Sequence, residues 1–295
     1  MLNSLIDLGR RLAAPFRPRR QAPSNLAARN RDPKAIAADV EYGLGTGRTY
    51  LYWLRSNGLN PAGAAALEIG PGIAFGPMAY LAAHGARVAV ADRWLAPFEA
   101  GYHDEYYRLL ADRIAAEDKE GDAAIVRRLA DKGYDDSPME LVHQSAESLD
   151  KDFKSRFDAV FSNAVLEHVA DIERSLEACA RATKPGGIGF HQIDFRDHRN
   201  FDRPLDHLLM SPDEFLSLSK SAYHEYGSTR RREDYDAAFR KAGFEIVSHQ
   251  SQSADPAYVA ELREKLARGS PEQRRLAASP HLADTGGFYV VRRGA

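Results

Sequence analysis

Cysteine is almost missing from this 295-residue sequence, which holds Cys179 and no other. A single cysteine excludes an internal disulfide and any zinc site built from several thiolates. Cys179 stands within a helical pattern, so we expect a buried small side chain rather than a reactive thiol. The fold must therefore rest on an apolar core, and hydrophobic residues, at 44% of the composition, are plentiful enough to form one.

Long apolar runs and a strong net charge are also missing. No segment approaches the ~20 apolar residues that a membrane-spanning helix needs, and we find no secretory signal peptide. The default expectation is therefore a cytoplasmic protein. The formal net charge of −2 produces no overall field that would attract nucleic acid, so we expect no nucleic-acid partner.

The first 32 residues differ from the rest of the chain. Apolar residues recur there at helical spacing, at Leu2, Leu5, Ile6, Leu8, Leu12 and Phe16. Five arginines are interleaved with them or follow them: Arg10, Arg11, Arg17, Arg19 and Arg20. This pattern is typical of a basic amphipathic helix on an anionic membrane surface, although a docked helix or a loose leader also fits it. We expect a leader and linker at 1–32, with peripheral contact at the inner membrane surface as one interpretation, and one domain at 33–295.

Short apolar strands alternate with helices through that domain. Strands are expected at 65–69, 87–91, 140–143, 157–162, 188–193, 244–248 and 288–291. Helices are expected at 77–84, 172–182 and 234–241, and from Pro256 to about Gly269. The alternation predicts an α/β fold with a doubly wound, mostly parallel sheet.

Three connections are longer than a minimal sheet requires, at about 93–138, 194–232 and 249–285. The first two begin where strands end, and open α/β sheets bind their ligands at the carboxyl ends of the strands. We therefore interpret them as helical caps that bind an acceptor substrate. The third belongs either to a cap or to a dimer contact, which leaves the oligomeric state open.

A glycine turn joins the first strand to the following helix. Gly70 and Gly72 allow a tight turn and a close approach of backbone to ligand, and the helix start offers N–H groups and a positive dipole end to a carboxylate. The dinucleotide fingerprint requires a small residue at position 75, where this sequence has Phe75. The turn thus argues against a nicotinamide-dependent oxidoreductase, which we keep as an alternative.

The segment Glu68–Gly72, with the sequence EIGPG, resembles the first motif of the class I S-adenosylmethionine-dependent methyltransferases. Ala74 replaces the family's common third glycine. The resemblance implies a Rossmann-like sheet of seven strands whose last strand is antiparallel, with 242–247 and 286–291 as the final pair. It also implies S-adenosyl-L-methionine as the cofactor and methyl donor.

Further segments match the family in the same order. Asp92 ends the second strand, where the family's acid binds the ribose hydroxyls, and Ser145–Glu147 resembles the segment beside the adenine. Residues 157–169 resemble the fourth-strand motif, and 183–187 the turn into the fifth strand. The donor-binding residues that the resemblance implies are Glu68, Gly70, Pro71, Gly72, Asp92, Arg93, Ser145, Ala146, Glu147 and Asn163.

Histidines and aspartates gather after the fifth strand. An oxygen acceptor has to lose a proton, which calls for a general base. We predict His198 as that base, with Asp194 and Asp197 either orienting it or binding a divalent cation, and His168 as a rival base. The candidate catalytic residues are His198, His168, His191 and Asp197. Because Asp-x-x-Asp-His has no spacing unique to metal sites, the sequence assigns no metal ligands and leaves the need for a divalent metal open.

Two further groups have open interpretations. The basic run Arg230–Arg232 either binds an acidic group of the acceptor or forms a solvated surface. The aromatic residues Trp94, Tyr102, Tyr106 and Tyr107 either line a substrate pocket or pack as a core. The sequence as a whole predicts O-methylation of a small molecule or saccharide, and a non-catalytic partner that binds S-adenosylmethionine is a further alternative.

Overall fold

The computed structural model describes residues 32–135, 137–219 and 224–294. The basic leader expected at 1–32 lies outside these residues, apart from Asp32 at its end. Among the residues that are described, no helix has the length and apolar character needed to cross a membrane.

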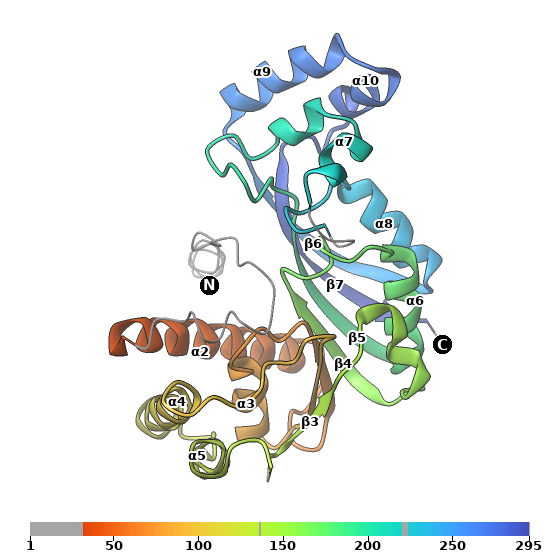
Figure 1. The fold of residues 1–295 in the computed structure, drawn as a ribbon. Helices are drawn as coiled ribbons and strands as arrows, with labels where there is room; N and C mark the ends of the chain where they lie inside the picture. The colour runs from red at the N-terminus through yellow and green to blue at the C-terminus, as the bar shows by residue number, and fades with distance from the viewer. Residues whose placement is uncertain (1–31, 136, 220–223, 295) are drawn as a thin grey trace. The chain divides into compact units, whose positions relative to one another are not determined.

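Seven strands form a single sheet in the order β3-β2-β1-β4-β5-β7-β6 (Figure 1). β2 pairs in parallel with both β1 and β3, and β7 runs antiparallel to its neighbours β5 and β6. The predicted Rossmann-like fold class is confirmed. The strands are β1 (Ala65–Ile69), β2 (Arg87–Ala91), β3 (Met139–Val142), β4 (Phe157–Asn163), β5 (Thr183–Asp194), β6 (Phe244–Ser253) and β7 (Asp284–Arg293).

The strands near the C-terminus are longer than predicted. β5 begins at Thr183, directly after helix α6, although the Pro-Gly-Gly sequence at 185–187 indicates a turn. Arg293 donates a hydrogen bond to the Thr183 carbonyl and Arg292 donates one to the Gly186 carbonyl, at 3.2 Å. Side chains from the end of β7 thus stabilise an extended chain that its local sequence disfavours.

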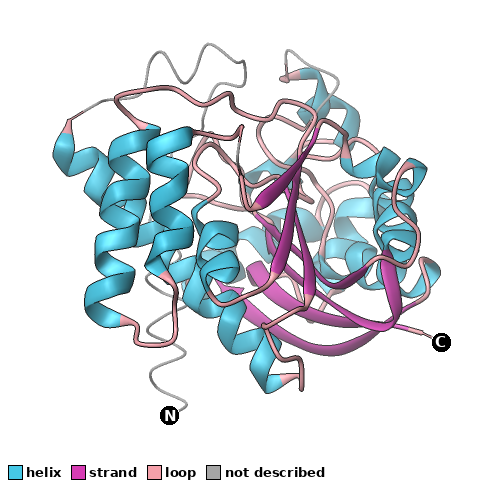
Figure 2. Cartoon of the chain, turned by 90° about the horizontal axis from the view of Figure 1, so that it is seen from below, coloured by secondary structure: helices cyan, strands magenta, loops and turns pink. Residues whose placement is uncertain are grey.

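The chain packs as two compact units, and each is considered on its own. Unit 1 holds the described residues up to Ser145 together with Arg156–Phe161; unit 2 holds Ala146–Ser155 and the described residues from Ser162 onward. Helices are cyan and strands magenta in Figure 2. The helices of unit 1 are α2 (Pro33–Ser56), α3 (Gly76–Ala83), α4 (His103–Glu117) and α5 (Ala123–Lys132).

Unit 2 contains the remaining described helices. Three α-helices match predicted segments closely, namely α6 (Ile172–Ala182), α8 (Arg232–Lys241) and α9 (Pro256–Ala267). The others are the 3₁₀ helices η2 (Ala146–Lys151) and η3 (Asp206–Leu209) and the α-helices α7 (Pro212–Ser217) and α10 (Pro271–Ala278). Asp255 caps α9, because its side chain accepts hydrogen bonds from the N–H groups of Ala257 and Tyr258. Cys179 is buried within α6, as expected.

Two insertions of unit 2 share a small apolar core of their own. The segments at 194–232 and 249–285 contribute Leu205, Leu208, Val259, Leu262, Leu266, Ala277 and Leu282 to it. Polar contacts reinforce the packing, since the Tyr258 hydroxyl accepts a hydrogen bond from the Leu205 N–H at 2.8 Å and donates one to Asp206 at 3.1 Å. The two insertions therefore fold against each other.

Helix α2 is a feature that the sequence pattern does not predict. Glycines at 43, 45 and 47 interrupt its apolar repeat, although Asp32 and Pro33 form a good start signal, with the Asp32 carboxylate accepting the Lys34 N–H. The structure explains two of the glycines by close packing. A Cβ at Gly47 would lie 2.7 Å from Cβ of Tyr80 on α3, and one at Gly43 would meet the Tyr106 hydroxyl of α4.

Replacing two of these glycines by alanine should give opposite results. Gly47→Ala is expected to lower the free energy of unfolding by about 1–3 kcal/mol, because the new methyl group overlaps Tyr80. Gly45→Ala has nothing within 4 Å of the added Cβ, so it should stabilise the protein by up to about 1 kcal/mol through helix propensity. Urea unfolding of both variants checks this, and equal effects at the two positions would contradict the packing argument.

Candidate functional site

The glycine turn after β1 has the left-handed backbone that its sequence predicts. Gly70 has φ 66° and Gly72 has φ 74°, values that side chains other than glycine rarely adopt. Phe75 also has a positive φ, 47°, and forms the N-cap of α3 without a side-chain hydrogen bond to the helix. No capping side chain therefore competes for the first N–H groups of α3, of which Pro77 supplies none, and such a helix start suits an anion.

Helix α4 holds this turn in place. The Tyr107 hydroxyl donates a hydrogen bond to the Ala74 carbonyl at 2.7 Å, and His103 Nε2 donates one to the Ile73 carbonyl at 3.0 Å. Tyr102 and Tyr106 are buried, whereas Trp94 is 47% exposed. The three tyrosines thus pack as a core, which is one of the two interpretations drawn from the sequence, and Tyr107 also positions the turn.

Glu68 lies at the end of β1 and is buried. Its Oε1 accepts a hydrogen bond from the Tyr50 hydroxyl of α2 at 2.8 Å, and its Oε2 has no hydrogen-bonding partner among the described residues. Burial raises the pKa of this carboxyl to about 7, and the Tyr50 hydrogen bond offsets only part of that rise.

This raised pKa predicts a pH-dependent cost that Glu68→Gln should remove. The unfolded chain releases the proton near pH 4.5 and the folded chain near pH 7, so wild-type stability falls between these values relative to the variant. We expect equal stabilities below pH 4.5 and an advantage of about 3 kcal/mol for the variant above pH 7. Urea unfolding across this range is the measurement. The exposed Glu264→Gln is the control, and parallel pH profiles for wild type and Glu68→Gln would contradict the assignment.

Asp92 follows β2 in unit 1. Its Oδ1 accepts a hydrogen bond from the Trp94 N–H at 2.7 Å, so the carboxylate also shapes the turn in which it lies. Burial raises the pKa of Asp92, although the Trp94 N–H and the Arg93 charge act in the opposite direction. Arg93 is exposed, with its guanidinium carbon 5.5 Å from the centre of the Trp94 ring.

The other predicted donor contacts fall in both units. Pro71 is buried inside the glycine turn, and Ser145 is half-buried in the segment after β3. In unit 2, Ala146 and Glu147 begin η2, and Asn163 is the last residue of β4. These positions agree with the predicted strand ends, and their donor contacts remain proposals.

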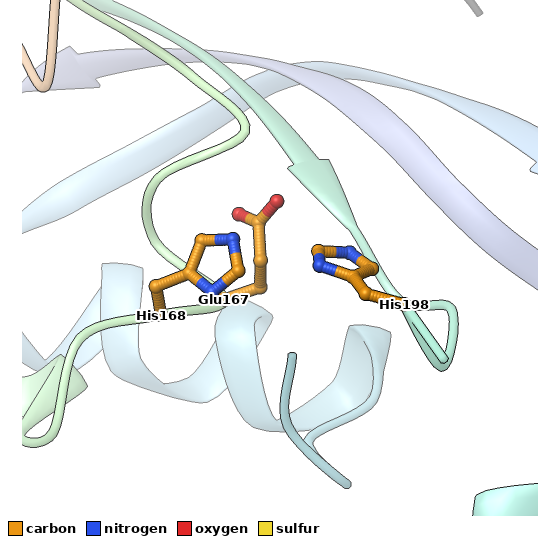
Figure 3. A group of neighbouring side chains, drawn as sticks. All are labelled: Glu167, His168 and His198. Atoms are coloured by element: carbon orange, nitrogen blue, oxygen red, sulfur yellow. The ribbon is translucent and has the colours of Figure 1, made fainter. Parts of the chain in front are cut away.

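A cluster of histidine and glutamate side chains lies in unit 2. After β4, Ala164 has φ 54° and donates its N–H to the Gln192 carbonyl of β5 at 3.1 Å. This turn leads to Glu167 and His168, while His198 comes from the loop after β5. One potential ligand atom from each of the three lies within 4.8 Å of those of the other two, and Figure 3 shows the side chains pointing toward one another.

Glu167 is the most isolated member of this Glu167–His168–His198 cluster. Its side chain is fully buried, and neither carboxylate oxygen has a hydrogen-bonding partner of ordinary geometry among the described residues. Burial raises the pKa of Glu167 well above its usual value, and the nearby Asp194 charge raises it further. Backbone N–H groups of Glu167 and Asp194 oppose this rise but do not cancel it.

The two histidines are oriented by neighbours. His168 Nδ1 donates a hydrogen bond to the His224 carbonyl at 2.7 Å, and burial lowers the pKa of His168 to about 4. His198 is buried, with Nε2 3.6 Å from Asp194 Oδ2. Burial opposes ionisation of Asp194, yet the nearby His198 ring and the hydrogen bonds from Arg196, at 2.6–3.1 Å, hold its pKa below the usual range.

Two predicted catalytic residues have other contacts. Asp197 accepts two hydrogen bonds from the Arg199 guanidinium, at 2.9 and 2.7 Å, which fasten the loop after β5. His191 is buried, bonded through Nδ1 to the Ser162 hydroxyl at 2.8 Å and packed on Phe239, and burial lowers its pKa to about 3. Both geometries favour structural roles, so we leave these residues out of the proposed acid–base set.

The basic run before α8 fits neither interpretation drawn from the sequence. Arg230 donates hydrogen bonds to the Val169 and Ala170 carbonyls, just after the cluster, at 3.0 and 2.8 Å. Arg231 is buried and donates to the carbonyls of Phe195, Leu282 and Asp284. Arg232 contacts Ser251, His281 and Asp284. These arginines therefore join segments of unit 2 that lie far apart in the sequence.

The sequence does not show how several residues support the site. Glu167 has a signal, because it stands beside His168 in the fourth-strand motif. Tyr50, His103 and Tyr107 have none, since their contacts to Glu68 and the glycine turn join residues 18 to 33 positions apart.

Comparison with known proteins adds sequence and fold relatives. A family model described as a methyltransferase domain matches residues 16–249. The chain is 30% identical over 112 residues to a ubiquinone biosynthesis O-methyltransferase from Azoarcus sp. (strain BH72), which covers 38% of this chain and 46% of that protein. A protein of the same name from Brucella ovis is 24% identical over 138 residues, which covers 43% and 54%. The chain thus spans about half the length of these curated relatives.

Solved structures are also similar over most of the chain. One of them is that of a candidate sarcosine dimethylglycine methyltransferase from Galdieria sulphuraria, which aligns with a TM-score of 0.50 at 16% identity and covers 86% of this chain and 87% of that one. At this identity the likeness concerns the fold.

Proposed function

Because this chain belongs to the methyltransferase domain family and has the class I fold, we propose that it transfers a methyl group from S-adenosylmethionine to an oxygen atom of a small molecule or saccharide. The family match leaves the nicotinamide-dependent oxidoreductase without support. O-methylation is the activity in the names of the two curated relatives, each of which the chain matches over about half of its length.

The donor is assigned to the residues that the family motifs match. The left-handed turn at Gly70 and Gly72 and the uncapped start of α3 suit a carboxylate, and Asp92 suits a pair of hydroxyl groups. Pro71 lies within the same turn, and Glu68, hydrogen-bonded to Tyr50, lies in the strand that leads into it. Arg93, Ser145, Ala146, Glu147 and Asn163 complete the proposed set on the resemblance alone. When bound, S-adenosylmethionine supplies an electrophilic sulfonium methyl group.

The observation that supports oxygen as the methyl-accepting atom is the Glu167–His168–His198 cluster. A hydroxyl group has to release its proton as the methyl group is transferred, so a nearby proton acceptor or cation is required. His198 is the proposed general base, with Asp194 orienting its ring from 3.6 Å. His168 is the rival, because its Nδ1–H is fixed on a carbonyl and its other nitrogen is therefore the one that can accept a proton.

Methyl transfer with tritiated S-adenosylmethionine tests the proposal. The acceptor probes are a catechol, a monosaccharide with free hydroxyls, and ethanolamine as an amine. We expect label in the catechol or the sugar, in a product that resists mild alkali as a methyl ether does. Label in the amine alone would overturn the oxygen assignment. Failure to bind S-adenosylhomocysteine in calorimetry would overturn the proposed donor.

A further inference from the structure

We infer that Glu167, His168 and His198 together bind one divalent transition-metal cation, through one carboxylate and two imidazole ligands. The sequence alone assigns no metal ligands, because the spacing after β5 is not that of a metal motif. The ligands instead come from two places about 30 residues apart, the turn after β4 and the loop after β5. Binding of the ion is independent of the proposed function. With the ion bound, His168 and His198 are ligands, so the cation rather than a free imidazole would activate the acceptor hydroxyl. This role of the ion rests on the proposed function.

The spacing of the three side chains fits a single ion. One ligand atom from each lies within 4.8 Å of the others. Ligands at ~2.1 Å from a metal are separated by roughly 3–4 Å, so small side-chain rotations bring all three to one centre. Figure 3 shows both imidazole rings turned toward the Glu167 carboxylate.

Glu167 provides the second and independent observation. A fully buried carboxylate that has no hydrogen-bonding partner of ordinary geometry among the described residues is costly, because the nearby backbone N–H groups replace only part of its lost hydration. Arg196, a neighbouring cation, is engaged with Asp194 through three contacts of 2.6–3.1 Å. A bound cation would compensate Glu167 directly, and the other way to satisfy it is a proton.

The histidines have the support that metal-binding imidazoles usually have. A ligating histidine commonly donates its second ring N–H to a carbonyl or carboxylate, which fixes its tautomer and orientation. His168 does so with the His224 carbonyl at 2.7 Å, which leaves Nε2 as the ligand nitrogen. His198 has Asp194 Oδ2 3.6 Å from its Nε2, which turns Nδ1 toward the cluster.

The donor set selects the class of ion. Two imidazoles and one carboxylate suit Zn²⁺, Mn²⁺, Fe²⁺ or Co²⁺, whereas Ca²⁺ and Mg²⁺ prefer oxygen ligands. Three protein ligands leave at least one coordination position for an acceptor oxygen. An ion in this position would lower the pKa of a bound hydroxyl group and hold its oxygen in place.

Calorimetry on the untagged full-length protein tests the site. After dialysis against a chelator, the protein is titrated with ZnCl₂, MnCl₂ or MgCl₂ alone. We expect one Zn²⁺ per chain and clearly weaker binding of Mg²⁺. Glu167→Gln and His198→Asn should weaken Zn²⁺ binding at least 10-fold, by the loss of one ligand each. His281→Asn, a half-buried histidine outside the cluster, is the matched control and should bind like wild type.

A second measurement uses only the wild-type protein, so it tests the site even if a variant does not fold. Wild type loaded with Cu²⁺ should show couplings from two imidazole nitrogens in pulsed electron paramagnetic resonance. Absence of a one-to-one Zn²⁺ site, or Cu²⁺ spectra without imidazole couplings, would overturn the inference, as would variants that bind like wild type. S-adenosylhomocysteine binding and methyl transfer, each measured with the chelated and with the Zn²⁺-loaded protein, separate the outcomes. A protein that transfers methyl groups but binds no ion would overturn the metal site alone. A protein that binds the ion but transfers no methyl group, even when loaded, would overturn the proposed function alone.

Discussion

Asp92→Ala is expected to weaken S-adenosylhomocysteine binding roughly 100- to 1,000-fold. A carboxylate that accepts hydrogen bonds from two ribose hydroxyls contributes about 3–4 kcal/mol, and each 1.4 kcal/mol corresponds to a factor of ten in the dissociation constant. Isothermal calorimetry measures the effect directly. Because Asp92 follows a paired strand and points into a turn, we expect the fold to survive the substitution.

Two further variants separate ribose binding from turn formation. Asp92→Asn keeps an oxygen for the Trp94 N–H but loses the negative charge, so donor affinity should fall while thermal stability stays close to wild type. Asp112→Ala, an exposed aspartate of the same unit, should leave donor affinity unchanged. Wild-type affinity in both Asp92 variants would refute the assignment of Asp92 to the ribose.

His198→Ala is expected to reduce turnover by roughly 100- to 10,000-fold, the range that a positioned acid–base group contributes. Loss of a metal ligand at the same position would have an effect of similar direction, so the measurement does not depend on which role His198 plays. S-adenosylhomocysteine affinity should change little, because His198 is not among the proposed donor contacts. Single-turnover transfer of labelled methyl groups is the appropriate assay.

The rival assignment has its own signature in the same assay. If His168 is the base, His168→Ala should lose turnover and His198→Ala should keep it. His281→Ala serves as the control and should behave as wild type in turnover and donor binding. Normal turnover in both cluster variants would remove the cluster from the chemistry altogether.

Strands and turns with strong local signals are predicted well from the sequence. β1 and β2 have the predicted bounds, because each is a short apolar run ended by a turn residue. α2 is missed, because its glycines fit tightly against Tyr80 and Tyr106 and resemble helix breakers in the sequence alone. β5 begins early because Arg292 and Arg293, more than 100 residues away, bond to its first carbonyls.

In the candidate site, too, local features are predictable from the sequence and long-range contacts are not. Gly70, Gly72 and Asp92 are predictable, because a glycine turn and an acid at a strand end are local features. The partnership of Glu167 and His168 with His198 depends on how two strand ends meet in three dimensions, and spacing along the chain does not encode it. Arg231 is an example in which a local pattern misleads. A run of three arginines resembles a surface patch, yet Arg231 is only 3% exposed.

The separate core shared by the insertions at 194–232 and 249–285 affects how this protein can diverge. Leu205 and Leu208 share an apolar core with Leu262 and Leu266. Replacing one insertion alone would therefore expose the apolar side chains of the other and lower the stability of the fold. Exchange of both together would carry the interface along intact. We therefore expect new acceptor preferences to arise, in evolution or in engineered chimeras, when both insertions are exchanged together.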